Sequence, residues 1–370
     1  MKSKILLLIA VFTFQWCLGQ SDKELVQQTL QNYMDGSSYN NKEQLSSAFA
    51  DNATLYLTVR GEFKMLTAQE YVSWFKGTPG EFNGRVAKLL SIELDNDIAT
   101  AKAEILIPRI KARFIDLFLL KKEAGHWKII SKTASRQESD KHGDRVLFVL
   151  SNAHFYGDTD LNNGNSFYEI VKAYVAFNEG GYNVDFVSPE GGAVPIAYIN
   201  TSDDTSKTYL YDEDLMYALK YTMSPSEVDP SAYKAIQFIG GGASMFGVPE
   251  NKAIQQIAMD IYEKHKGIVS SVCHGTSGIV YLKTSNGKYL VDGKRVSGYP
   301  DAYENKERPF YATFPFKITQ TIEKHGGIFK HGPRNTAYVE VDGRLVTGQN
   351  WLSSVPVAEK IIELLQEDKL

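Results

Sequence analysis

The sequence contains very little cysteine: Cys17 and Cys273 are the two among 370 residues. A framework of several disulfides is therefore excluded, and so are zinc sites built from clustered cysteines. Cys17 falls in a leader-like segment, so an exported chain would keep Cys273 as its single thiol. A lone thiol outside the cytoplasm is either buried and inert or retained for its reactivity, and its position in the fold decides between the two.

Long hydrophobic runs are also scarce. Apart from Ile5–Phe14, no stretch is apolar enough to cross a membrane. That run follows two lysines and leads to the small residue Gly19, which predicts a signal peptide over residues 1–20 and an exported protein, periplasmic or secreted. A membrane anchor is the alternative. Lipidation of Cys17 is disfavoured because the bulky Trp16 precedes it.

Excess charge of either sign is absent as well. The formal net charge is -4, and no arginine-rich stripe is present, which argues against a nucleic-acid partner. Hydrophobic residues make up 43% of the chain and charged residues 23%, so disorder is not expected. A chain of 370 residues is long enough for two domains, and nothing after the leader predicts stable membrane insertion.

The first predicted domain covers residues 21–138. Helical spacing marks Asp22–Met34, with Asp22 as its cap, and a second helix is expected over Lys42–Phe49. Strand-like runs follow at Thr54–Val59, Val86–Leu94, Ile98–Ile107, Ala112–Lys121 and His126–Lys132. Helices followed by a meander of strands predict an α+β sheet curled over its helices.

This domain resembles the SnoaL-like, nuclear-transport-factor-2-like superfamily. The resemblance rests on the segments Leu30–Gly36 and Ser47–Asp51, and most clearly on the late strands that begin at Phe114 and Gly125. It implies a cone-shaped fold that can enclose a pocket, with Asp116 and His126 as polar candidates. The alternative is a polar face on the strands of a dimerising or docking domain.

A polar linker over residues 139–144 separates this domain from a second one over residues 145–370. Strands and helices alternate there, which predicts a parallel α/β sheet covered on both faces. The expected strands are Arg145–Leu150, Asn183–Val187, Ala235–Ile239 and Gly267–Val272, and the expected helices are Ser166–Phe177, Asn251–Lys264 and one that starts over Gly278–Leu282.

The strongest motif joins a β-branched run, Ile268–Val272, to Cys273-His-Gly-Thr-Ser-Gly278. A strand, a sharp turn with a nucleophile at its apex and a helix form a nucleophile elbow. The amides and dipole at the start of the helix are expected to lower the pKa of the Cys273 thiol. The alternative is a cysteine that only fills the core. Gly240, Gly241 and Gly242 end the preceding strand, where free amides could bind an oxyanion, or where a flexible turn is all that is needed.

The second domain resembles the ThiJ/PfpI superfamily, which includes parkinsonism-associated deglycases and class I glutamine-amidotransferase-like proteins. The resemblance implies a flavodoxin-like α/β sandwich. Two long insertions, at residues 191–233 and 305–337, point to its glyoxalase III and chaperone-like branch. The motifs that carry it are Val184–Ser188, Ile236–Ala243, Val272–Gly275, Val291–Asp301 and Gly343–Asn350.

The branch implies roles for four residues of this chain: Cys273 as nucleophile, His274 beside it, Glu304 as the acid that orients the histidine, and Glu169 against the sulfur. Spacing alone places Glu169 opposite the apolar stripe of its helix, which predicts a solvent-facing side chain. Without the family, Glu304 could equally be a loop charge.

The sequence departs from the branch at two positions. Thr276 stands where proline is common after Cys-His-Gly, and Gly242 stands where the glycine loop commonly has a histidine. The first change is expected to be tolerated at the turn. The second removes a polar group near the pocket, which puts the identity of the substrate in doubt.

The resemblance implies a cysteine-dependent enzyme that acts on small carbonyl compounds, a glutathione-independent glyoxalase or a deglycase. The resemblance also implies that such an enzyme needs no metal or nucleotide cofactor, and that the Gly241 and Cys273 amides bind the oxyanion. A cysteine amidase or peptidase would use the same residues, and a chaperone or oxidation sensor is the non-enzymatic alternative. A homodimer is compatible with either role.

Overall fold

The computed structural model describes residues 21–367, so the predicted signal peptide and Cys17 lie outside the described residues. The chain divides into two compact units. The first runs up to Glu81 and adds Ile92–Ala101 and Leu117–Thr133, and the second comprises Phe82–Ser91, Lys102–Asp116 and the chain from Ala134 onward. Across this described part, no helix is both long enough and apolar enough to cross a membrane.

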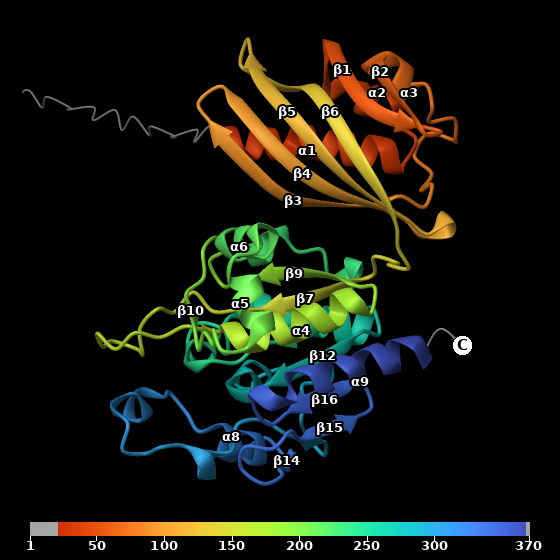
Figure 1. The fold of residues 1–370 in the computed structure, drawn as a ribbon. Helices are drawn as coiled ribbons and strands as arrows, with labels where there is room; N and C mark the ends of the chain where they lie inside the picture. The colour runs from red at the N-terminus through yellow and green to blue at the C-terminus, as the bar shows by residue number, and fades with distance from the viewer. Residues whose placement is uncertain (1–20, 368–370) are drawn as a thin grey trace, which may run out of the picture. The chain divides into compact units, whose positions relative to one another are not determined.

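The N-terminal part is an α+β fold, as predicted, with six strands in the order β2-β1-β6-β5-β4-β3 and α1 lying against them (Figure 1). Strand β1 pairs antiparallel with β2 and parallel with β6. Strand β2 and helix α3 were not predicted, because almost every side chain of β2 is exposed and leaves no alternating pattern. The elements are α1 (Asp22–Ser38), α2 (Lys42–Ser47), β1 (Phe49–Val59), β2 (Glu62–Thr67), α3 (Ala68–Val72), β3 (Val86–Asp95), β4 (Ile98–Ile107), β5 (Ala112–Glu123) and β6 (His126–Glu138).

Helix α1 is capped by Ser21, so the prediction that Asp22 caps it was wrong. The Ser21 hydroxyl accepts a hydrogen bond from the Glu24 amide at 3.3 Å, and the Glu24 carboxylate accepts one from the Ser21 amide at 2.6 Å. The two reciprocal bonds form a capping box. The Asp22 carboxylate instead accepts from Lys122 at 2.6 Å and from the Trp127 indole at 3.0 Å.

The two polar candidates of this fold lie in different environments. Asp116 on β5 is buried, whereas His126 is exposed at the first residue of β6. The interior beside α1 is aromatic, with the ring centroids of Tyr33 and Phe118 4.9 Å apart. A side chain inside an enclosed pocket would be shielded from solvent, so the exposed His126 is a poor candidate for a pocket residue.

The C-terminal part is the expected α/β sandwich. Its sheet has the order β15-β16-β12-β11-β7-β9, and every pair is parallel except the edge pair of β15 with β16. In chain order the parallel strands run 2-1-3-4-5, which is the flavodoxin-like order. The strands are β7 (Arg145–Val149), β9 (Asn183–Val187), β11 (Tyr233–Phe238), β12 (Ile268–Val272), β15 (Val339–Asp342) and β16 (Leu345–Gly348).

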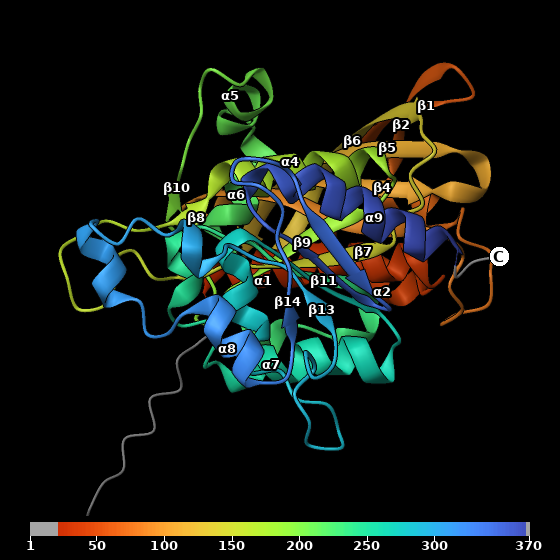
Figure 2. The ribbon, with the colours of Figure 1, turned by 90° about the horizontal axis from the view of Figure 1, so that it is seen from below.

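Helices cover both faces of this sheet (Figure 2). Because side chains alternate along a strand, β7 sends Val146 and Phe148 into one core and Leu147 and Val149 into the other. Helices α4 and α9 pack on the first core, and α7 and α8 pack on the second. The helices are α4 (Phe167–Glu179), α5 (Asp204–Leu210), α6 (Glu213–Lys220), α7 (Lys252–Met259), α8 (Ile318–Lys324) and α9 (Ser354–Glu367), and α7 continues as a π-helical segment, Asp260–Lys264.

The strand order places a ligand site at one edge of this sheet. Strand β7 has β9 on one side and β11 on the other, so the chain reverses its winding direction between β7 and β11. In open α/β sheets, ligands bind outside the carboxyl ends of the strands at such a switch point. The glycines after β11 and Cys273 after β12 both lie at this end.

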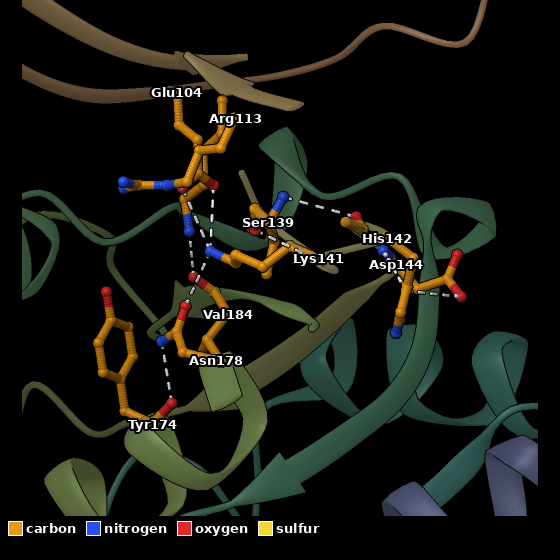
Figure 3. A network of polar contacts seen from close by, with 12 residues as sticks. Glu104, Arg113, Ser139, Lys141, His142, Asp144, Tyr174, Asn178 and Val184 are labelled. Atoms are coloured by element: carbon orange, nitrogen blue, oxygen red, sulfur yellow. Dashed lines mark hydrogen bonds and ion pairs between the residues drawn. The ribbon is translucent and has the colours of Figure 1, made fainter. Parts of the chain in front are cut away.

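A buried ionic cluster holds the predicted linker within the second unit (Figure 3). The Glu104 carboxylate accepts from Lys141 at 3.2 Å and from Arg113. The Lys141 ammonium also donates to Asn178 at the end of α4, at 3.3 Å. Burial alone would raise the pKa of Glu104, but Lys141 and Arg113 hold that pKa below its usual value.

Candidate active site

Cys273 occupies the apex of a tight turn at the end of β12, as predicted. All five residues of β12 are buried, and the Cys273 backbone has a positive φ of 57°, which is uncommon for a residue with a side chain. The turn passes so close to β11 that a Cβ on Gly275 would lie 2.2 Å from the Phe238 carbonyl oxygen. Glycine is therefore required here to let the chain reverse under the sulfur.

The helix after Cys273 differs from the prediction. A 3-10 helix, Cys273–Ile279, follows the strand directly, in place of an α-helix that starts over Gly278–Leu282. So short a helix sums few peptide dipoles. The Cys273 side chain is 7% exposed, and burial together with the neighbouring Glu169 raises the pKa of the thiol well above its usual value. This direction is opposite to the expected lowering of the pKa, and it favours the thiol form of the resting sulfur.

His274 and Glu304 form a chain of contacts that ends at the sulfur. The His274 Nδ1 atom lies 3.6 Å from Cys273 Sγ, and its Nε2 lies 2.8 Å from Glu304 Oε1. A carboxylate only accepts hydrogen bonds, so Nε2 carries the hydrogen and Nδ1 turns its lone pair toward the thiol. The Tyr299 ring stacks on the imidazole at 4.6 Å, which fixes the plane of the ring.

Glu169 points into the site and not to solvent, which corrects the expectation from helical spacing. It lies in the first turn of α4, is 2% exposed, and accepts a hydrogen bond from the Gly240 amide at 2.9 Å. The same carboxyl group hydrogen-bonds to the Cys273 thiol. Burial raises the pKa of Glu169 to about 7, so this group gains and loses a proton near neutral pH.

The glycine loop after β11 lies under the same sulfur. A Cβ on Gly240 would meet Glu169 Oε2 at 2.6 Å and Cys273 Cβ at 2.9 Å, so only glycine allows these two side chains to approach each other here. Gly241 has a positive φ of 101°, and both Gly241 and Gly242 line the cavity above the sulfur. The glycine loop therefore places main-chain atoms close to the sulfur of Cys273.

Both departures from the family pattern have a structural explanation. A Cβ on Gly242 would come within 2.3 Å of the Tyr156 hydroxyl, so Tyr156 supplies a polar group close to where the expected histidine would begin. Thr276 is fully buried, and its hydroxyl lies 2.9 Å from the Ser271 hydroxyl and donates to the Ser297 carbonyl oxygen at 3.1 Å. These hydrogen bonds stabilise the turn at the position where the branch commonly has a proline.

The four side chains and the glycines open on one cavity of about 570 Å³. Sequence reasoning missed most of its walls, because all but Tyr168 of α4 come from loops and short turns whose residues have no periodicity. The two insertions noted from sequence contribute several of them: Tyr198 comes from residues 191–233, and Arg308, Phe310, Phe314 and Arg334 come from residues 305–337. The walls that were not predicted include Tyr156, Tyr168, Tyr198, Tyr299, Arg308, Phe310, Phe314, Arg334 and Trp351.

Two family models match the chain. The model described as "DJ-1/PfpI family" matches residues 161–364, which is more than half of the chain. A second model, described as "Putative lumazine-binding", matches residues 21–135. The two matches fall on the two parts for which separate resemblances were stated from sequence.

Curated relatives and a solved structure each match about 60% of the chain. Glyoxalase 3 of Candida albicans is 30% identical over 237 residues, which is 59% of this chain and 97% of that protein. Glutathione-independent glyoxalase HSP31 of Saccharomyces cerevisiae is 29% identical over 60% of this chain and 98% of its own length. The solved structure of the Rapid Encystment Protein of Francisella tularensis is 27% identical, with a TM-score of 0.57 over 60% of this chain and 99% of that one.

Proposed function

The chain belongs to the DJ-1/PfpI family, and from that premise we propose that it is a glutathione-independent glyoxalase that converts 2-oxoaldehydes such as methylglyoxal to 2-hydroxy acids. The observation that carries the proposal is the chain of contacts from Glu304 through His274 to Cys273. The Glu169 carboxyl group also contacts the sulfur. The glyoxalases among its relatives support the same reaction class.

The first step is attack of sulfur on the aldehyde carbon. Because the resting group is a thiol, His274 Nδ1 removes the proton as the C–S bond forms. The proton is then returned to the former aldehyde oxygen, which gives a neutral hemithioacetal. Glu304 stabilises the imidazolium that exists between these two transfers.

The second step moves a proton between the two carbons. The ionised Glu169 takes the hydrogen from the carbon bonded to sulfur, which gives an enediolate, and returns it to the adjacent carbon, while the hydroxyl proton of the first carbon passes to the oxygen of the second. A pKa of about 7 suits a group that must both accept and release a proton. The product is a 2-hydroxyacyl thioester of Cys273, which water hydrolyses to the hydroxy acid and the free thiol. The net reaction adds one water and requires no external oxidant or reductant.

Negative charge on oxygen develops in both steps. Gly241 and Cys273 both line the cavity, and we assign their amides to this oxyanion.

The test is methylglyoxal consumption by purified protein without glutathione, followed as lactate formed. We expect Cys273→Ala to abolish turnover, with an unchanged thermal melt as the control for folding. Full consumption by the Cys273→Ala protein would remove the proposal.

A cysteine amidase is the second candidate, because a Cys-His-Glu arrangement serves acyl transfer equally well. Small amides and 2-oxoaldehydes assayed side by side separate the two. Amide hydrolysis without 2-oxoaldehyde turnover would favour the amidase.

A further inference from the structure

The cavity above Cys273 is far larger than methylglyoxal requires. Its volume of about 570 Å³ lies within the range of ~300–1,000 Å³ typical of sites for much larger, drug-sized ligands. A small 2-oxoaldehyde bound at the sulfur would leave most of this space to water. The residues that line the rest of the cavity therefore indicate which chemical groups the rest of the substrate contains.

Two arginines line this cavity, Arg308 and Arg334, both from the insertion at residues 305–337. The Arg308 side chain is exposed. The Arg334 guanidinium donates to the Tyr303 carbonyl oxygen at 3.0 Å and hydrogen-bonds to the Tyr299 hydroxyl. Within residues 21–367, neither guanidinium has a carboxylate at ion-pair distance.

Arg334 is linked to His274 through the ring of Tyr299. Tyr299 bonds to Arg334 at its hydroxyl and stacks on His274, the residue in contact with the thiol. A guanidinium held in this way is oriented before a ligand arrives, which lowers the entropy cost of binding an anion.

The acidic groups of the same cavity do not neutralise the arginines. Glu304 is bonded to His274, and Glu169 is bonded to the Gly240 amide and the thiol. Since the pKa of Glu169 is about 7, part of this group is neutral at physiological pH. The two guanidinium groups can therefore pair with an anionic group of a ligand.

The cavity also has apolar walls. The rings of Tyr156 and Phe310 stack at 4.8 Å, and Phe314 lies 5.6 Å from the His274 ring. Such surface suits the methylene groups of a short carbon chain.

We propose that the physiological substrate is a 2-oxoaldehyde that carries a carboxylate on a short carbon chain, with its aldehyde at Cys273 and its carboxylate at Arg308 and Arg334. A guanidinium matches a carboxylate with two parallel hydrogen bonds, which gives both affinity and orientation. The inference rests on the proposed glyoxalase activity and adds the substrate class to it.

The turnover experiment compares 4,5-dioxopentanoate with its methyl ester, in which a neutral ester replaces the charged terminal carboxylate. We expect the wild-type kcat/KM to favour the carboxylate by at least about tenfold, mainly through KM. Arg308→Gln and Arg334→Gln are expected to bring the ratio of the two substrates close to one. Lys306→Gln, which removes a cation from the same loop outside the cavity wall, is the matched control and should keep the wild-type ratio.

A binding experiment separates this inference from the proposed function. The Cys273→Ala protein is titrated calorimetrically with 4-oxopentanoate, which has no aldehyde, and with its methyl ester. Tighter binding of the anion, weakened by Arg308→Gln, supports the anion site even if no aldehyde is turned over. Equal binding of anion and ester overturns the inference. Methylglyoxal turnover without any carboxylate preference overturns it too, and leaves the glyoxalase proposal standing.

Discussion

The carboxyl group of Glu169 and the thiol of Cys273 are hydrogen-bonded to each other, and both residues are buried at the base of the cavity. Burial raises the pKa of both groups, and the charge of Glu169 raises the pKa of the thiol further. The pair consequently keeps its protons to a higher pH than either group would in water. Nucleophilic attack therefore depends on proton removal as the substrate binds, and His274 is the group placed to remove that proton.

Replacing Glu169 by glutamine is expected to lower the pKa of the Cys273 thiol. The amide keeps the shape of the side chain but removes the negative charge that opposes a thiolate. The measurement is the rate of iodoacetamide alkylation as a function of pH, whose midpoint should move downward. Glu179→Gln, on the exposed end of the same helix, is the control and should leave the midpoint unchanged. A midpoint that stays in place or rises would show that the carboxylate is not what raises the thiol pKa.

The same variant is expected to stabilise the protein at alkaline pH. The pKa of Glu169 rises from an ordinary 4.5 to about 7 on folding, so the folded state binds this proton more tightly than the unfolded state. The associated stability is fully present below pH 4.5 and is lost as the pH rises through 7. Glutamine does not ionise, so at pH 8 the Glu169→Gln protein should be more stable by up to about 3 kcal/mol. Urea unfolding should show this gain shrink steadily toward pH 5, and a gain independent of pH would contradict the argument.

Much of this fold could be predicted because its strands have clear patterns. Strands β4 and β9 begin and end where the sequence predicts. Cys273 was recognised because a β-branched run followed by a glycine-bearing turn is a local signal.

What could not be predicted depends on contacts between distant segments. Glu169 faces inward because the Gly240 amide and the thiol bind its carboxylate, which helical spacing does not reveal. The short helix after Cys273 and the raised thiol pKa likewise follow from burial in the assembled sheet. Arg308 and Arg334 reach the cavity from loops that carry no periodic pattern.

Export of the protein remains a prediction from the first twenty residues. We expect the mature chain to begin close to Gln20 and to be recovered outside the cytoplasm. Intact-mass analysis of the native protein after cell fractionation measures both. A full-length chain in the cytoplasmic fraction would contradict the prediction, and a Leu7→Arg change, which interrupts the apolar run, should block processing.

Glu304→Gln should reduce kcat with little effect on KM. The glutamate is buried against His274, and its charge stabilises the imidazolium that forms when the thiol loses its proton. The uncharged amide removes that stabilisation and can also present its NH₂ group, which would reverse the tautomer and aim a hydrogen at the sulfur. Loss of a positioned proton-transfer partner typically costs about 100-fold in rate. Glu307→Gln, on an exposed part of the same loop, is the matched control and should retain wild-type kcat. If both variants keep wild-type kcat with unaltered melting curves, then Glu304 orients nothing that the reaction needs, and the proton must leave the thiol by another route.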